Sequence, residues 1–335
     1  MNLNRFIFWR DPAIEARLSA LEDRALIEER RVVQCDMAPA PSQPSKVKVP
    51  SAEYPTLQEA VDKITWRCTI VIVDGTILPK THFYHRDYRH LTITGRCSID
   101  DVYGFRVVNA QSPIFSEMAI DGAKCKDVFK AERNASLWVQ LSRITNAKHA
   151  AISATRCSQV YAHTLECTNC CTEGSADKRV SVIAVDRASQ GSFRELKIAG
   201  SGWNGVQGSL GAIVDVRGAD IRQCKSYGIR ATNAGLINAD ECHVRDCGRA
   251  GIYASYGGTL NARDGRVGNT GGDPSVPNAN NAANVLCFGG LVYAGEGFQS
   301  DPVAPGAAGW KNLNEGKIID SGSRSYGSGG IKVGL

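Results

Sequence analysis

Three segments, AIVDVR at 212–217, GLINAD at 235–240 and GTLNAR at 258–263, follow one another at intervals of 23 residues and decide the fold. The same interval separates glycines that each precede a branched apolar residue, in Gly205-Val206, Gly228-Ile229 and Gly251-Ile252. A fixed period held over three consecutive segments is the mark of an internal repeat. The sequence therefore predicts stacked coils, each of which buries its apolar face only against its neighbours.

The period continues on both sides of these coils when insertions are allowed. We predict one apolar column that comprises Phe105, Phe129, Ile152, Ile183, Val206, Ile229, Ile252, Val292 and Ile331. Its three long intervals place insertions near 170–180, 269–285 and 296–314. Within each coil, apolar and polar positions alternate over short runs, which is typical of strands with one buried face. The fold class predicted is all-β, a parallel β-helix of about ten coils.

Composition agrees with short strands and turns, because the 335 residues include 34 glycines and only 7% aromatics. The net charge of +5 is spread over 39 basic and 34 acidic residues, so no nucleic-acid partner is predicted. No apolar run approaches the roughly 20 residues that a membrane helix needs, so no membrane partner is predicted. The amino terminus also lacks the order of a secretory signal.

The chain divides into three parts at its proline-rich stretch. Residues 1–35 are predicted as an attachment segment with a helix, 36–50 as a Pro-rich linker, and 51–335 as the β-helix domain. The helix begins at Asp11-Pro12, and its apolar residues have the spacing of a short coiled coil. The oligomerisation positions are Ile14, Leu18, Leu21 and Ala25. A single amphipathic helix packed on another surface is the alternative.

A contiguous apolar patch precedes this helix, formed by Phe6, Ile7, Phe8 and Trp9. Such a patch on a polar protein usually marks a docking surface, so we predict that it anchors the chain to a partner. The alternative is that the patch folds back on the chain's own helix.

Residues 54–64, YPTLQEAVDKI, and 69–77, TIVIVDGTI, resemble the start of pectate-lyase-like right-handed β-helix proteins, especially the phage tailspike and tail-fibre members. Thr56 and Glu59 form a capping box that opens a short helix there. The resemblance implies a right-handed β-helix whose first coil is capped by this helix. It also implies a homotrimer carried on a virion.

From these features we predict a phage virion structural protein. It would be a trimeric fibre, spike or collar component, attached to tail or neck proteins through residues 1–35 and therefore located on the virion. Two alternatives stay open: a tailspike depolymerase that cleaves host surface polysaccharide, and a non-enzymatic fibre that binds a host surface glycan. Phe298 and Trp310, in the late insertions, are predicted to contact either a glycan or a neighbouring virion chain.

No catalytic residue and no cofactor is predicted, because the repeat rarely stacks two acids. Glycan hydrolysis needs two nearby carboxylates. In the three clearest coils only Glu241 and Asp264 share a column, which favours a solvated turn. Two mixed columns are predicted instead, Asp215 with Asn238 and Asn261 as a polar ladder, and Asp220 with His243 and Arg266.

The 12 cysteines divide by position. Cys167 and Cys242 fall in columns expected to be buried, so the single Cys167-x-x-Cys170 spacing is not taken as a metal site. Cys224 and Cys247 are one coil apart and form either a disulfide or a pair of stacked thiols. Cys35, Cys170 and Cys171 are expected to be exposed, and are candidates for covalent cross-links between subunits or to neighbouring proteins.

Overall fold

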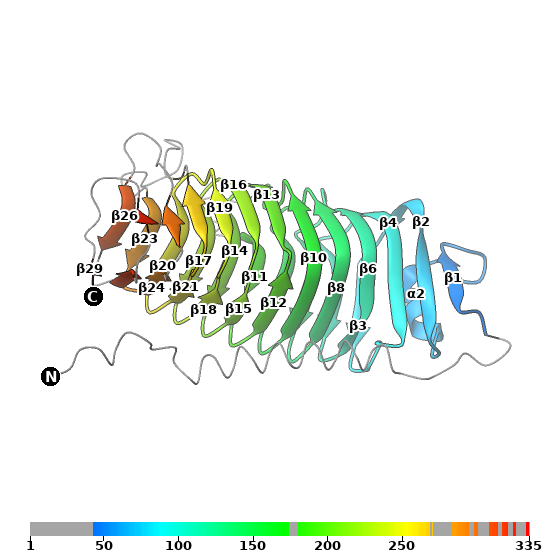
Figure 1. Ribbon diagram of the computed structural model, residues 1–335. Coiled ribbons are helices and arrows are strands. Elements are labelled where there is room, and N and C mark those ends of the chain that lie inside the picture. Colours follow the sequence, from blue (N-terminus) through cyan, green and yellow to red (C-terminus); the bar gives the residue numbers. More distant parts are fainter. Residues whose placement is uncertain are drawn as a thin grey trace.

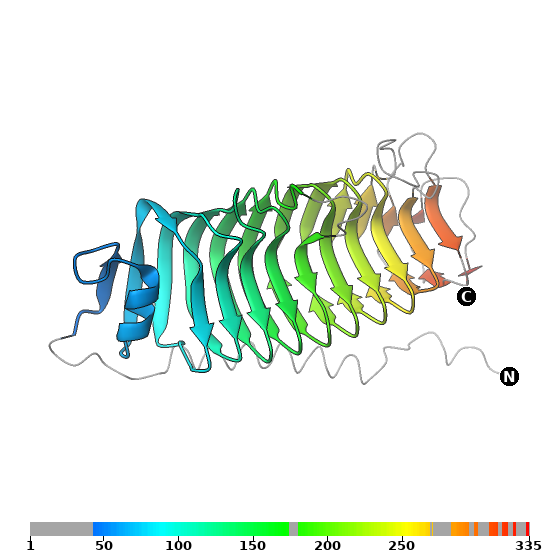
Figure 2. The same cartoon turned by 180° about the vertical axis from the view of Figure 1, so that it is seen from behind.

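The computed structural model describes residues 43–173, 180–268, 270, 283–294, 298–300, 308–313, 317–320, 324–325 and 333–334. These residues form a parallel β-helix whose rungs stack along one axis (Figures 1 and 2). The predicted fold class and the 23-residue period are confirmed, for example by the pairing of Val206 with Ile229 and of Ile229 with Ile252. The predicted anchor and coiled-coil positions of segment 1–35 lie outside the described residues.

Two sheets build the rungs. The smaller, sheet B, has 10 strands, namely β3 (Thr81–Tyr84), β5 (Tyr103–Val108), β7 (Asp127–Glu132), β9 (Ala150–Thr155), β11 (Ser181–Val185), β14 (Asn204–Ser209), β17 (Tyr227–Thr232), β20 (Ala250–Ser255), β23 (Ala283–Phe288) and β26 (Ala308–Leu313). Its strands pair in parallel from one coil to the next, as stacked coils require.

The larger sheet, sheet A, has 19 strands. Its long early strands are β1 (Lys46–Val49), β2 (Cys68–Leu78), β4 (Leu91–Ile99), β6 (Gln111–Asp121), β8 (Ser136–Thr145) and β10 (Gln159–Thr168). Later rungs split into two short strands, so that β10 pairs with both β12 and β13. These later strands are β12 (Gln190–Arg194), β13 (Lys197–Ser201), β15 (Ile213–Asp215), β16 (Asp220–Cys224), β18 (Leu236–Asn238), β19 (His243–Arg245), β21 (Thr259–Asn261), β22 (Arg266–Gly268), β24 (Leu291–Ala294), β25 (Gln299–Ser300), β27 (Lys317–Asp320), β28 (Arg324–Ser325) and β29 (Val333–Gly334).

The apolar column of sheet B follows the predicted order from Phe105 to Ile252. Beyond Ile252 it continues to Val285 and Trp310, so the predicted continuation through Val292 was wrong. Val292 lies in sheet A instead, where it pairs with Leu260. An insertion interrupts the period here, and several apolar residues that follow it could restart the column, so arithmetic alone cannot choose the register.

Four fully buried phenylalanines, Phe83, Phe105, Phe115 and Phe129, fill the first coils. The ring of Phe115 has its centroid 4.9 Å from that of Phe105 and 4.8 Å from that of Phe129, in tilted and edge-on arrangements. Such pairs add about 0.5–1.5 kcal/mol each beyond the burial of their area. Phe298, predicted to be a contact residue, is also fully buried in the core.

The first coil is closed by the predicted capping helix, α2 (Leu57–Lys63). The Thr56 hydroxyl accepts a hydrogen bond from the backbone nitrogen of Glu59 at 3.2 Å, which confirms Thr56 as the N-cap of the predicted box. Strand β1 pairs with β2 beside this helix, so the β-helix begins at Lys46, inside the predicted linker. Within the described ranges, no helix has the length and apolar character needed to cross a membrane.

Candidate functional site

One outward face of sheet A carries two rows of polar side chains, which we call the charged strip. Its first row lies on β4, β6, β8, β10, β13, β16, β19 and β22 and comprises Arg96, Ala119, Arg143, Glu166, Lys197, Asp220, His243 and Arg266. Its second row, two residues further along each strand, comprises Ser98, Asp121, Thr145, Thr168, Ala199, Arg222, Arg245 and Gly268. Neighbours in a row are about 4.8 Å apart, so the strip is about 34 Å long.

The middle of the strip is partly neutralised. Glu166 forms a short ion pair with Arg143, with 2.7 Å between Nη2 and Oε2, and lies 3.8 Å from the ammonium group of Lys197. Both pairs are partly exposed, so each stabilises the fold by at most about 1 kcal/mol. Their main effect is that one carboxylate offsets part of the positive charge of these two cations.

The two ends of the strip carry uncancelled charge. Arg96 has the small Ala119 as its neighbour in the row, so it finds no acidic partner on the next coil. Arg222 and Arg245 stack on each other at the opposite end. All three side chains are exposed, and none forms an ion pair with the residues that the structure describes. Unpaired cations at both ends of the strip are suited to an anionic ligand that lies along the axis.

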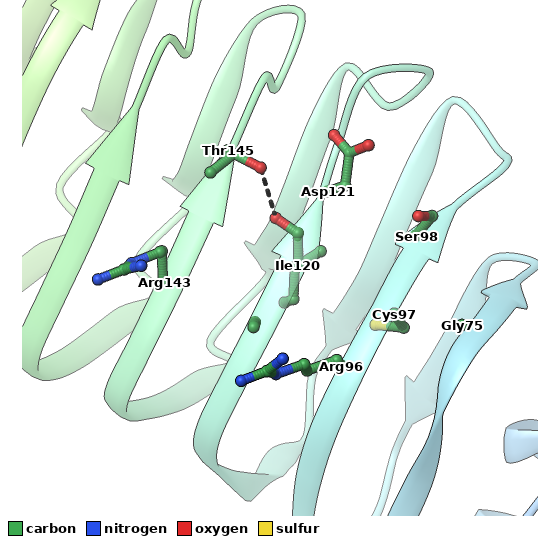
Figure 3. Close-up of a pocket in the computed structure, with 9 residues that line it drawn as sticks. Gly75, Arg96, Cys97, Ser98, Ile120, Asp121, Arg143 and Thr145 are labelled. Carbon is green, nitrogen blue, oxygen red and sulfur yellow. Dashed lines mark hydrogen bonds between the residues drawn. The ribbon is translucent and has the colours of Figure 1, made fainter.

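A hollow of about 270 Å³ opens at the amino-terminal end of the strip, over Ala119. In Figure 3, Arg96 and Arg143 project from one side of this hollow, and Asp121 stands at the other. The Asp121 carboxylate accepts hydrogen bonds from the Asn146 side chain at 3.0 Å and from the backbone nitrogen of Ala123 at 3.2 Å. The hollow thus places two guanidinium groups two coils apart, with a fixed carboxylate beside them.

A second hollow, of about 360 Å³, lies at the other end, where Gly268 leaves the second row without a side chain. Its lining includes Asp220, His243 and Arg266, and the predicted stacking of these three residues is confirmed. Both hollows therefore form where a small residue interrupts a row of charged ones. The first hollow was missed by the sequence analysis, because Ala119 and Arg143 are 24 residues apart rather than 23 and β4 and β6 contain a register shift.

The acidic residues that the 23-residue repeat places in columns do not form a catalytic pair of carboxylates. Glu241 and Asp264 are exposed turn residues with positive φ angles of 59° and 52°, as expected for a solvated turn. The Asp215, Asn238 and Asn261 ladder is confirmed, and the Asn238 amide donates to Asp215 at 3.2 Å.

The cysteines differ from the prediction at the first insertion. Cys170 and Cys171 are buried, not exposed, so the predicted cross-linking role for them was wrong. Their thiols turn inward, and that of Cys171 donates to the carbonyl oxygen of His149 at 2.6 Å. Burial raises the pKa of Cys170 to about 11. Cys35 lies outside the described residues, and Cys157 is the exposed cysteine among those described.

The stacked pair, Cys224 and Cys247, is present as buried free thiols. A hydrogen bond between the two, together with burial, raises the pKa of Cys224 well above its usual range. Cys167 and Cys242 are buried, as predicted. Within the described ranges, no three His, Cys, Asp or Glu side chains converge as a metal site would require.

Sheet B carries a second group of charges that the sequence analysis did not find. Lys130 lies 3.7 Å from a carboxylate oxygen of Asp127 and 3.7 Å from one of Glu132, while Arg106 pairs with Glu132 at 2.6 Å. Burial raises the pKa of Asp127. Burial also opposes ionisation of Glu132, but the hydrogen bond from Arg106 and the positive charges of Lys130, Arg106 and Arg156 together outweigh it and lower the pKa of Glu132. The four groups satisfy one another, which is typical of a structural ion-pair network.

Comparison with known proteins finds a likeness of fold only. No family model and no curated protein matches the chain. Among solved structures, the A-module of mannuronan C-5 epimerase AlgE4 from Azotobacter vinelandii aligns with a TM-score of 0.46 and 9% identity, over 82% of this chain and 93% of that one. An alginate lyase from Paenibacillus sp. str. FPU-7 aligns with a TM-score of 0.40 and 11% identity, over 85% and 96%. The catalytic domain of a GH87 α-1,3-glucanase aligns with a TM-score of 0.42 and 11% identity, over 84% of this chain and 70% of that one. At such identities, nothing about the activity of this chain follows from the likeness.

Proposed function

We propose that the protein binds an acidic polysaccharide along its charged strip, with the sugar chain parallel to the axis of the β-helix. The observation that carries the proposal is the exposure of Arg96, Arg222 and Arg245 without ion-pair partners among the described residues. A linear ligand with repeated negative charges can contact both ends of the strip at once. Two modest contacts on one chain reinforce each other through their high effective concentration.

The hollows support a glycan rather than a flat protein partner. Each has room for a sugar ring and combines guanidinium groups with hydroxyl or carboxylate groups, as polar ring substituents require. Arginine binds carboxylates through two parallel hydrogen bonds, which gives the contact geometric specificity. Among the functions considered from the sequence, this proposal selects the fibre that binds a surface glycan.

Binding of fluorescent polygalacturonate to the full chain tests the proposal. An exposed arginine–carboxylate contact is worth about 0.2–1 kcal/mol, so the double variant Arg222→Gln/Arg245→Gln is expected to bind between about twofold and thirtyfold more weakly. The matched control, Lys46→Gln/Lys48→Gln, removes the same charge from exposed positions on β1 and is expected to bind normally. Equal affinity for neutral dextran, or unchanged binding by the strip variant, would contradict the proposal.

The same experiment distinguishes binding alone from the depolymerase alternative. New reducing ends or unsaturated ends of the sugar chain are measured over time. Their appearance would show that the strip cleaves the ligand it binds. The virion attachment, the trimer and the anchoring role of segment 1–35 stay predictions, since they rest on residues outside the described ranges. Co-purification of partners with the full chain but not with a 36–335 fragment would support them.

A further inference from the structure

A second row of arginines lies away from the charged strip, at the turn that leads from sheet B back to sheet A. Arg133, Arg156 and Arg187 directly follow β7, β9 and the rung of β11, at the same position of three successive coils. Backbone hydrogen bonds fix this register, from Asn134 to the carbonyl oxygen of Arg156 at 3.1 Å and from Cys157 to that of Arg187 at 3.0 Å. We call these three residues the arginine ridge.

The ridge is exposed and only weakly compensated. All three side chains are exposed, and none forms an ion pair with the residues that the structure describes. Arg156 acts on Glu132 only through a longer-range charge interaction, because the Glu132 carboxylate is already bound by Arg106 at 2.6 Å. Asp186, which precedes Arg187, makes no ion pair with it. Three like charges spaced by about 4.8 Å repel one another, so the arrangement favours binding of negative charge.

Backbone conformation makes arginine a costly choice at this turn. Arg133, Arg156 and Arg187 have φ angles of 58°, 61° and 53°, in the left-handed region that favours glycine and asparagine. Asparagine does occupy the equivalent position of two other coils, as Asn109 and Asn233, both with φ of 49°. The turn therefore does not need arginine for its shape.

The flank of the ridge is open. The residue after each arginine is small and exposed, namely Asn134, Cys157 and Ala188. A polymer can therefore approach the three guanidinium groups from this flank, and it meets the exposed Leu210 only at the next coil, where that residue stacks on Arg187.

We propose that the arginine ridge is a second binding track for a linear acidic polysaccharide that carries one carboxylate per sugar. The coil spacing is close to the advance of one sugar in an extended chain, so successive carboxylates can meet successive arginines. Phosphates along one strand of duplex DNA advance by about 3.4 Å per nucleotide and match the ridge less well. The proposal goes beyond the charged strip, because the ridge lies at a different corner of the rung and gives each chain two separate tracks.

Titration calorimetry of the full chain with short oligogalacturonates tests the ridge. The unmodified protein is expected to bind two oligosaccharides per chain. The triple variant Arg133→Asn/Arg156→Asn/Arg187→Asn is expected to bind one, and the strip variant Arg222→Gln/Arg245→Gln also one, at the ridge. Affinity at the ridge is expected to fall between about threefold and 150-fold in the triple variant, since three charge contacts are lost. The asparagines suit the left-handed turn, so the variant should keep the melting temperature of the parent.

Two further proteins and one further ligand complete the test. The variant Lys46→Gln/Lys48→Gln/Lys63→Gln removes the same charge from exposed residues near the cap and should still bind two. The variant Arg133→Lys/Arg156→Lys/Arg187→Lys should retain part of the affinity, because it keeps the charge but loses the two-bond geometry. Two bound oligosaccharides in the asparagine variant would overturn the proposal. Tighter binding of duplex DNA than of oligogalacturonate at the ridge would overturn its ligand class. If Arg222→Gln/Arg245→Gln still bound two oligosaccharides while the triple ridge variant bound one, the proposed function of the charged strip would be contradicted and the ridge supported.

Discussion

Replacing the stacked glycines Gly205, Gly228 and Gly251 by alanine, one at a time, tests how closely the coils approach. A methyl carbon added at Gly205 would lie 2.5 Å from the carbonyl oxygen of Gly228. The same atom at Gly228 would lie 2.8 Å from the oxygen of Gly251, and at Gly251 it would lie 3.2 Å from that of Asn284. Ordinary contacts begin at 3.4 Å, so the backbone clash weakens along the column, but at Gly228 and Gly251 the added carbon would meet a methyl group of Val244 or Val267 even more closely.

The size of each effect follows from two opposing terms. Overpacking a core by one methyl group costs about 1–3 kcal/mol. Alanine also restricts the unfolded chain, which stabilises the fold by about 0.4–1 kcal/mol where φ is compatible, and none of the three glycines has a positive φ. We therefore expect net losses of about 1–2 kcal/mol for each of the three variants. Val244 and Val267 are buried and β-branched, so their methyl groups cannot rotate away without cost, and this side-chain clash makes up for the weaker backbone contact at the latter two sites.

Urea unfolding of the purified variants measures the free energies, provided that the denaturant slope stays constant. Hydrogen exchange then shows whether the loss is confined to the neighbouring coils, as expected for a repeat protein. Gly218→Asn is the matched control, since Gly218 has φ of 71° and no atom within 4 Å of the added carbon. A wild-type midpoint for Gly205→Ala or for Gly251→Ala would refute the reasoning.

Two further predictions concern the ionisable groups. Burial raises the pKa of Asp127, so ionisation of this carboxyl opposes folding as the pH rises through that pKa. The variant Asp127→Asn is therefore expected to raise the urea midpoint at pH 7. Below about pH 3.9 the midpoint should be nearly unchanged, because the carboxyl is then protonated in the unfolded chain as well. A lower midpoint at pH 7 would show that the attraction of Lys130 outweighs the burial. Burial raises the pKa of Cys97 and of Cys125 to about 12, so in a Cys35→Ser variant a thiol reagent at pH 8 should modify Cys157 rapidly and the other described cysteines only after unfolding. Rapid modification of Cys170 or Cys171, read by peptide mass spectrometry, would instead restore the predicted cross-linking role.

Part of the candidate site could be predicted from the sequence, because residues separated by one repeat period become neighbours in space when the coils stack. The stacking of Asp220, His243 and Arg266 follows from the 23-residue period, and it lines the second hollow. The first hollow could not be read in this way, because a register shift and a 24-residue coil displace Arg143 from its expected partner. The arginine ridge obeys the period but spans the first insertion, where the interval from Arg156 to Arg187 becomes 31 residues.

The sequence by itself determined the repeat, the parallel β-helix, the capping helix and the membership of most columns, because these depend on period and local pattern. Only the tertiary structure decided which side chains are covered and which charges are cancelled. Cys170 and Cys171 border an insertion, yet they turn into the core. Arg143 is balanced by Glu166, whereas Arg96 is not, because the residue stacked on it is alanine. Exposure and charge compensation depend on what lies one coil away in space, and the insertions and bulges that set this neighbour leave no periodic signal in the chain.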